Sequence, residues 1–395
     1  MKQTKILYLI AIGLGCLCGY FDFAQPLSIF ISNAFVKMFK CISLPMIAIS
    51  LAVSLSKHES AKSEGLGKQA LFYTLGTTVA ASTVACLLYL LISPSNTTLA
   101  RAVTAVKDIN LTTSKYSDYV LGIIPSNILS PFLEHNVMGA LLFGGIAGIA
   151  TRYMPDLQSR SMSNFLKTIY EMLFIIVGWI AKILPVALFG FISTAVTQIK
   201  GGISIRGIGE YLAVVVLANA IQGAMVLPTF LRANKVRPWF SFKGMLPALS
   251  VAFFSKSSVG TLPVTMDTAE KNLRVSKSIS RFVFPLCTAI NMNGCAAFIF
   301  TTVIYVMQNN GIAISFVTLF QWILISAIAA IGNAGVPMGC FFLSMSLLTS
   351  MDVPVDLLWL ILPFYGIIDM IETALNVWSD CCVVSVIDKR SKQEQ

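Results

Sequence analysis

The chain has 395 residues, of which 56% are hydrophobic and 12% are charged, and its mean hydropathy is +0.78. Soluble domains usually carry about 25% charged residues, so this composition excludes an ordinary water-soluble domain. The net charge of +10 does not indicate nucleic-acid binding, because Lys and Arg are dispersed among short loops without a zinc-finger or RNA-binding motif. We therefore expect one integral membrane domain over residues 1–395.

Apolar segments near the ~20 residues that cross a bilayer recur along the chain. We expect eight spanning helices, at about residues 5–22, 28–56, 68–93, 119–151, 164–198, 207–231, 282–307 and 357–387. The first is read as an uncleaved helix, because no convincing signal-peptide cleavage site follows it. Kinks or breaks are expected where helix-breaking residues fall in the third, fourth and sixth segments, at Gly76, Pro125, Asn127 and Pro228.

Two further apolar regions, residues 244–270 and 317–350, each consist of two short arms around a break. The breaks are Lys256–Gly260 and Gly332–Pro337. Arms of roughly 10 to 14 residues are too short to span, which favours re-entrant hairpins whose irregular tips line a cavity. Two hairpins in corresponding positions are typical of a transporter with inverted repeats.

The charges of the predicted loops indicate an orientation, because Lys and Arg concentrate on the cytoplasmic side. The N-terminus, the 57–68, 152–168 and 232–243 loops and the C-terminus are all basic. We therefore expect both termini to be cytoplasmic and the protein to lie in a cell membrane, in bacteria the inner membrane.

The final predicted helix carries five polar residues, Asp369, Glu372, Thr373, Asn376 and Asp380. At about 3.6 residues per turn their spacing places them within an arc of about 100°. A charge at mid-membrane costs about 2.5 to 3.5 kcal/mol and is usually tolerated only where it meets an ion, a substrate or a partner. The alternative is that these side chains only link helices, with Asp369 or Glu372 paired to Lys256.

The sequence Asn291-Met292-Asn293-Gly294 is a turn signal inside a predicted span. It predicts either a local unwinding that exposes carbonyl groups or a simple kink. Asp380 and Asn376 offer the oxygen ligands that a small hard cation prefers. The nine cysteines show no paired metal-ligand spacing and lie mainly in apolar stretches, so we expect free, buried thiols.

Four ordered motifs now carry a resemblance: Ser257–Met266, Asn291–Gly294, Gly335–Pro337, and the Asp369 to Asp380 pattern of the last helix. They are similar to the signatures of the dicarboxylate/amino acid:cation symporter family, the glutamate transporters. The motifs cover about the last 150 residues, and hydropathy extends the resemblance over the rest. The resemblance implies an all-α, elevator-type transporter with eight transmembrane helices, two re-entrant hairpins and a homotrimeric state.

The same resemblance implies a scaffold at about residues 1–60 and 119–198, and a mobile transport part at about 66–94 and 207–388. It implies that Ser258 and Asn376 hold a substrate α-carboxylate, and that Asp369 and Thr373 hold its α-amino group. The implied substrate pocket comprises Ser257, Ser258, Cys295, Val336, Pro337, Asp369, Glu372, Thr373 and Asn376, with Gly335–Pro337 as the outer gate.

Sodium, without a covalent cofactor, is the coupling ion that the resemblance implies. One sodium site would use Asn291, Asn376 and Asp380, and a second would use carbonyl groups near Ala289, Ala330, Ile331 and Asn333 together with Met292. The resemblance implies the loss of a third family sodium site, because Thr77, Ala80 and Ala81 stand at its helix 3 positions and Asn293 replaces its Asp. We expect fewer coupled sodium ions than in glutamate carriers.

Two departures bear on the substrate. Acidic-substrate members have an Arg at the position of Glu372 and a Thr at that of Cys295. Two carboxylates a few ångströms apart repel by several kcal/mol at an effective dielectric of about 20. Glu372 to Asn376 instead resembles the serine/threonine branch, so we expect import of a small neutral amino acid.

Other functions stay open at this point. Within the class, the alternatives are sodium- or proton-coupled transport of glutamate, aspartate or a C4-dicarboxylate, and transport of a cationic substrate paired with Glu372. Outside it, the alternatives are an ion channel and an intramembrane enzyme using Ser257 or Ser258, although no nucleophile motif surrounds these serines. ATP-driven pumping is disfavoured because no phosphate-binding loop is present.

Overall fold

The structure is a computed structural model that describes residues 2–56, 61–97, 125–133, 136–200, 206–333, 335 and 338–393. All regular elements in these ranges are helical, which confirms the all-α fold class. The helices are α1 (Lys2–Tyr20), α2 (Gln25–Leu55), α3 (Ala61–Ile92), α5 (Ser130–Leu133), α6 (Val137–Arg152), α7 (Asp156–Lys200), α8 (Arg206–Ile221), the π-helix η1 (Gln222–Val226), α9 (Leu227–Ala233), α10 (Pro238–Ser255), α11 (Ser258–Asn272), α12 (Lys277–Ile290), α13 (Asn293–Asn309), α14 (Phe316–Ile331), α15 (Gly339–Ser350) and α16 (Asp356–Gln393).

Five helical segments in the described ranges are long and apolar enough to cross a membrane. They are Gly65–Ile92, Asp156–Ile180, Arg206–Ala233, Lys277–Asn309 and Asp356–Gln393. Each overlaps a span that the sequence predicts. The total of eight spans stays a prediction.

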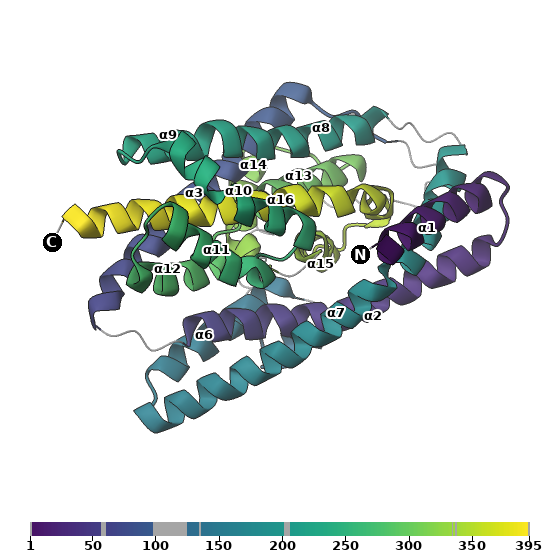
Figure 1. Cartoon of the computed structure of the whole chain (residues 1–395). Coiled ribbons are helices and arrows are strands. Elements are labelled where there is room, and N and C mark those ends of the chain that lie inside the picture. Colours follow the sequence, from purple (N-terminus) through teal and green to yellow (C-terminus); the bar gives the residue numbers. More distant parts are fainter. Residues whose placement is uncertain are drawn as a thin grey trace.

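Helices α1, α2, α6 and α7 pack against one another along one side of the molecule, where α2 and α7 run side by side (Figure 1). Small residues allow these backbones to approach closely. A Cβ added at Gly148 of α6 would lie 2.6 Å from the Ala52 carbonyl oxygen of α2, and one added at Gly15 of α1 would lie 2.9 Å from the Phe189 carbonyl oxygen of α7. Small-residue contacts of this kind are the usual way in which helices associate in lipid.

Helix α16 runs through the middle of the remaining helices and packs against α10, α12 and α13 (Figure 1). Most of its residues between Leu357 and Asp388 are buried, including apolar side chains on several faces. A helix that is hydrophobic nearly all round belongs in the interior, so its few polar side chains are enclosed as well.

The two predicted hairpin regions each contain two helices around a break. Helices α10 and α11 are separated at Lys256, whose φ of 56° is left-handed. The break between α14 and α15 includes Gly335 with φ 64° and Met338 with φ 63°. A left-handed backbone ends a helix, so a break is present in each region, although the first is limited to Lys256 and Ser257. The expected arm length of roughly 10 to 14 residues is wrong for three of the four helices, because α10 has 18 residues, α11 has 15 and α14 has 16. Re-entry into a membrane stays a prediction.

The predicted interruption at Asn291 is also present. Helix α12 ends at Ile290, α13 begins at Asn293, and Asn291 and Met292 have the non-helical ψ angles 77° and 62°. Near Pro228, the sixth predicted span changes to a π-helix at Gln222–Val226. Pro125 and Asn127 precede α5, as expected for a break, whereas α3 continues through Gly76 without interruption.

We predict that Gly148→Ala lowers the free energy of unfolding by about 1–3 kcal/mol, because the added methyl group overpacks the contact between α6 and α2. Gly145→Ala is the matched control, since its added Cβ would meet only the Leu51 side chain at 3.7 Å. The control should be neutral or stabilising by up to about 1 kcal/mol through helix propensity. Thermal unfolding in detergent measures both, and equal melting temperatures would contradict the close contact.

Candidate functional site

The five polar residues of the last helix are all buried. Asp369, Glu372, Thr373, Asn376 and Asp380 are each no more than 5% exposed. Thr373 Oγ1 donates to the Asp369 carbonyl oxygen at 2.7 Å, as a Thr in a helix commonly does. The predicted face therefore points into the protein, where each charge needs a polar partner.

Asp380 is held by the interrupted helix α12–α13. Asn291 Nδ2 donates to Asp380 Oδ1 at 3.0 Å, and Thr288 Oγ1 donates to Asp380 Oδ2 at 3.2 Å. The turn at Asn291 aims this amide at α16, because the chain leaves the helix at that residue. Asn291 and Asp380 of the first predicted sodium site thus lie together.

A network of neutral polar groups surrounds Asn291. Its Oδ1 accepts from Asn293 Nδ2 at 2.8 Å, Thr77 Oγ1 at 3.2 Å and Ser379 Oγ at 3.2 Å. Gln222 Nε2 in turn donates to Asn293 Oδ1 at 2.6 Å and to the Thr77 carbonyl oxygen at 3.0 Å. Amides and hydroxyls bond one another here without a carboxylate at position 293, although the Gln222 Oε1 has no hydrogen-bond partner among the described residues.

Asn376 faces the start of α13. Its Oδ1 accepts from the Gly294 backbone N–H at 2.8 Å. A Cβ added at Gly294 would lie 2.8 Å from the Glu372 Cα, so only glycine permits this approach. Among the described residues, the hydrogen-bond acceptors of Asn376 Nδ2 are two sulfur atoms, Met292 Sδ at 3.4 Å and Cys295 Sγ at 3.6 Å. Because sulfur is a weak acceptor, this amide N–H group retains donor capacity.

The residues of the second predicted sodium site lie at two helix ends. Ala289 is the second-to-last residue of α12, and Ala330 and Ile331 end α14. The Ala330 carbonyl oxygen accepts from the Asn333 N–H at 3.0 Å, and Asn333 Nδ2 lies 3.8 Å from Met292 Sδ. Helix C-termini carry partial negative charge, which favours a cation.

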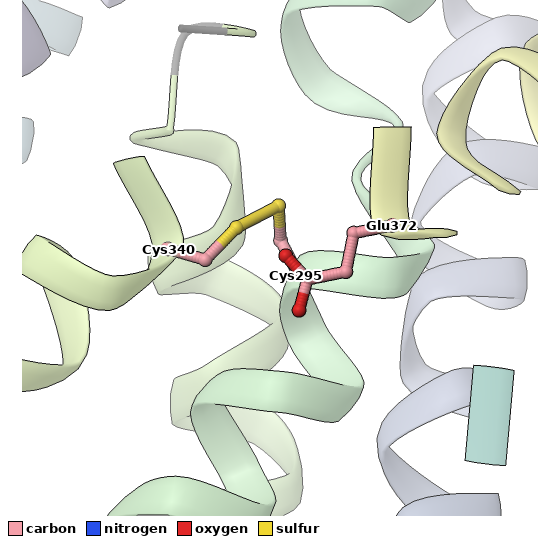
Figure 2. A group of neighbouring side chains, drawn as sticks. All are labelled: Cys295, Cys340 and Glu372. Carbon is pink, nitrogen blue, oxygen red and sulfur yellow. A yellow bond between two sulfur atoms is a disulfide. The ribbon is translucent and has the colours of Figure 1, made fainter. Parts of the chain in front are cut away.

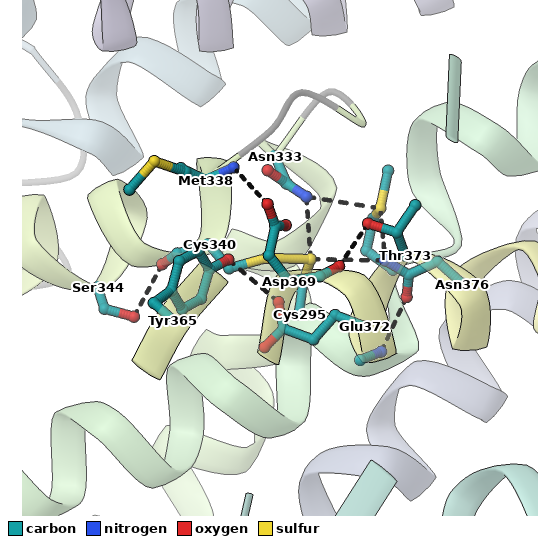
Figure 3. The surroundings of a disulfide bond; sticks show 12 residues. Cys295, Asn333, Met338, Cys340, Ser344, Tyr365, Asp369, Glu372, Thr373 and Asn376 are labelled. Carbon is teal, nitrogen blue, oxygen red and sulfur yellow. Dashed lines mark hydrogen bonds between the residues drawn. A yellow bond between two sulfur atoms is a disulfide. The ribbon is translucent and has the colours of Figure 1, made fainter. Parts of the chain in front are cut away.

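The two hairpin breaks meet near α16. Ser257 caps α11 by accepting from the Gly260 N–H, and its Oγ donates to the Gly335 carbonyl oxygen at 3.2 Å. The Met338 backbone N–H donates to Asp369 Oδ2 at 3.2 Å (Figure 3). Val336 and Pro337 lie outside the described residues.

Ser258 is buried as the first residue of α11, but among the described residues no hydrogen bond joins it to another predicted site residue. Lys256 forms no ion pair with Asp369 or Glu372 in the described ranges. Its Nζ instead lies 3.6 Å from where a Cβ would stand at Gly366, one turn before Asp369 on α16.

The two carboxylate oxygens of Glu372 differ in their hydrogen bonding. Its Oε2 accepts from the Tyr365 hydroxyl at 3.1 Å, while Oε1 is buried and has no hydrogen-bond partner in the part of the chain that the structure describes. Beside it, Cys295 of α13 and Cys340 of α15 form a disulfide (Figures 2 and 3). The expectation of free, buried thiols is therefore wrong for this pair, because the fold brings together two positions separated by 45 residues. It is also wrong for Cys16 and Cys41, which are free but exposed.

The sequence prediction omitted six residues of this region: Gln222, Thr288, Met338, Cys340, Tyr365 and Ser379. Gln222 could have been found as a polar residue inside an apolar span. Tyr365 could have been found because it precedes Glu372 by seven residues, about two turns on the same helical face. Nothing in the sequence pairs Thr288 with Asp380, or Cys340 with Cys295.

A cavity of about 1280 Å³ lies apart from these polar residues. It is bounded by α8 to α10 and by another face of α16, with Ala374, Leu375 and Trp378 among its lining residues. None of the five predicted polar residues of α16 lines it. The candidate site is therefore distinct from this cavity.

Comparison with known proteins gives the family. A model of the sodium:dicarboxylate symporter family matches residues 5–390. The chain belongs to this family. It is thus a membrane transporter and not an enzyme, which removes the alternative of an intramembrane enzyme using Ser257 or Ser258.

Individual members of the sodium:dicarboxylate symporter family are similar at low identity. The neutral amino acid transporter B(0) of Oryctolagus cuniculus is 26% identical over 381 residues, covering 87% of this chain and 70% of the relative. The neutral amino acid transporter A of Homo sapiens is 25% identical, with 89% and 74% covered. The excitatory amino acid transporter 2 of Homo sapiens is 25% identical, with 96% and 78% covered.

We predict that Asn291→Ala lowers the free energy of unfolding by about 1–3 kcal/mol, because three donors lose their acceptor and Asp380 loses a donor in a buried site. Asn310→Ala is the matched control, since the Asn310 amide bonds only backbone carbonyl groups at a partly exposed helix end. The control should lose at most about 1 kcal/mol. Equal losses in chemical denaturation would contradict the central role of the Asn291 amide.

Proposed function

We propose that this chain is a sodium-coupled symporter that imports a small neutral amino acid, similar to serine or threonine. The proposal rests on the environment of Glu372, which is a buried carboxylate without a cationic partner in the described ranges. It lies between Asp369 and Asn376 along α16. Family membership and relatives named as neutral amino acid transporters support it.

Helix α16 carries hydrogen-bond acceptors suited to the ammonium group of an amino acid and a hydrogen-bond donor suited to its carboxylate. Asp369 and Thr373 are proposed to accept hydrogen bonds from the substrate ammonium group. Asn376 and Ser258 are proposed to donate to its carboxylate. The Asn376 N–H groups are available for this because their acceptors among the described residues are weakly accepting sulfur atoms. Ser257, with Val336 and Pro337 of the second tip, would close over the substrate, and Cys295 would line the pocket.

Glu372 selects against acidic side chains. Two unit charges 4 Å apart repel by about 4 kcal/mol at an effective dielectric of 20, equivalent to roughly a thousandfold in affinity. A hydroxyl side chain can instead donate to the unbonded Glu372 Oε1. This reasoning favours serine-like substrates over the acidic alternative that the excitatory relative represents.

Sodium is proposed to bind at two places. Asn291, Asn376 and Asp380 would form one site, and the carbonyl groups near Ala289, Ala330, Ile331 and Asn333 would form the other with Met292. A third site is not proposed, because Asn293 is a neutral amide already bonded to Asn291 and Gln222. We therefore propose fewer coupled ions than glutamate carriers use.

An elevator movement in a homotrimer is proposed for transport. Residues 1–60 and 119–198 would be the scaffold, and residues 66–94 and 207–388 would move. The close packing of α1, α2, α6 and α7 is consistent with a separate scaffold. A bacterial inner membrane location with both termini in the cytoplasm completes the proposal.

We predict that Glu372→Arg shifts the preference toward acidic substrates, because a cation replaces the repelling carboxylate. In proteoliposomes, the ratio of aspartate to serine uptake should rise at least about tenfold, which corresponds to ~1.4 kcal/mol. Glu372→Gln is the matched control, since it removes the repulsion without supplying a cation and should change the ratio less. Efficient aspartate or glutamate uptake by the unmodified protein would contradict the neutral-substrate proposal.

We predict that Asp380→Asn weakens sodium binding at least about tenfold, because a neutral amide replaces the charged oxygen ligand. The measurement is the rise in melting temperature with sodium concentration, since a ligand that binds the folded state stabilises it by mass action. Asp388→Asn is the control, because Asp388 lies on the same helix but pairs with Lys392 at 2.6 Å. If the melting temperature of Asp380→Asn rose with sodium concentration as in the unmodified protein, Asp380 would not be a sodium ligand.

A further inference from the structure

Three potential metal ligands from three helices converge beside the proposed substrate site. The sulfur atoms of Cys295 and Cys340 and a carboxylate oxygen of Glu372 all lie within 4.8 Å of one another. Each residue is 1% exposed. In Figure 2 the Glu372 carboxylate extends toward the sulfur of Cys295, which is bonded to that of Cys340.

We propose that, once the disulfide is reduced, Cys295, Cys340 and Glu372 bind a thiophilic divalent cation of the zinc and cadmium class. Two thiolates and a carboxylate are ligands that zinc accepts, with a fourth position left for water or substrate. Sodium prefers oxygen ligands, so this site differs chemically from the proposed coupling-ion sites.

The cysteine spacing suits this ligand set. Zinc holds thiolates at about 2.3 Å, which places two sulfur atoms about 3.8 Å apart in a tetrahedral site. The Cα atoms of Cys295 and Cys340 are 5.4 Å apart, so side-chain rotation alone can separate the sulfur atoms after reduction. Asn333 Nδ2 donates to Cys295 Sγ at 2.9 Å, a contact that favours the thiolate and orients it.

Glu372 supplies the independent observation that points to a cation. Its Oε1 is buried without a hydrogen-bond partner, and no ion pair in the described ranges includes the residue. A buried carboxylate oxygen without a partner costs free energy, and a bound divalent cation would remove that cost. Two thiolates and one carboxylate carry a charge of −3, which the divalent cation reduces to −1.

Metal binding requires prior reduction of the disulfide. A phosphine gives two electrons to the sulfur–sulfur bond and is oxidised to the phosphine oxide, while one water molecule supplies the oxide oxygen and the two protons that complete the thiols. The cation then forms two sulfur bonds and displaces those two protons into solvent, so binding should strengthen as pH rises. A bound ion would join α13, α15 and α16.

Metal titration of the purified full-length protein tests the proposal. The protein is reduced with a phosphine, the reductant is removed, and cadmium is added while the ultraviolet thiolate-to-metal absorption is recorded. We expect saturation at one cadmium per chain, with zinc competing for the same site. Cys295→Ser, Cys340→Ser and Glu372→Gln should each weaken binding by about 10–100-fold.

Two controls keep the result interpretable even where a variant folds poorly. Cys287→Ser removes a buried, unpaired thiol of α12 and should leave the affinity unchanged. The unreduced protein has the same sequence but bonded sulfur atoms, and it should give no saturable absorption. Equal cadmium binding before and after reduction, or binding retained in both cysteine variants, would overturn the site.

The consequence for transport rests on the proposed function and is measured separately. Micromolar zinc should inhibit uptake by the reduced protein in proteoliposomes, and Cys340→Ser should require at least about tenfold more zinc. Absence of any amino acid uptake would defeat the proposed function, while the absorption titration would still decide the metal site. If protein shown to bind cadmium takes up amino acid without inhibition by zinc, the proposal that the ion joins α13, α15 and α16 is contradicted.

Discussion

The burial of three carboxylates along one helix is the constraint on which the rest of this molecule depends. Asp369, Glu372 and Asp380 are each at most 4% exposed and stand in a helix surrounded by other helices. Such charges are stable in a nonpolar interior only with directed polar partners. The helix interruption at Asn291 and the break at Met338 supply those partners to Asp380 and Asp369.

The buried acids therefore require hydrogen-bond donors, and the unwound segments provide them. A continuous helix would bond its own N–H and carbonyl groups, whereas an interrupted one turns them toward a charge or an ion. Helix α16 brings the acids, and the chain breaks around it bring the donors and carbonyl groups. This arrangement gives a member of the sodium:dicarboxylate symporter family a polar interior within the helices that surround α16.

Much of this arrangement could be predicted from the sequence because it depends on local rules. Gly, Pro and Asn mark the helix breaks, and the periodicity of 3.6 residues places Asp369 to Asp380 on one face. The kink or break expected at Gly76 is absent, because a single glycine in an otherwise favourable helix need not interrupt it. Contacts between distant segments could not be predicted from these local rules. Asn291 donates a hydrogen bond to Asp380 across 89 residues, and Cys340 bonds to Cys295 because α15 packs on α13.

Sodium-driven accumulation of a neutral amino acid in proteoliposomes tests the central claim most directly. Labelled serine should rise inside the vesicles above its external concentration when sodium is imposed outside, and should only equilibrate when potassium replaces sodium. An excess of unlabelled threonine should compete, and an excess of glutamate should not. Accumulation of serine without a sodium gradient, or its displacement by glutamate as readily as by threonine, would contradict the account.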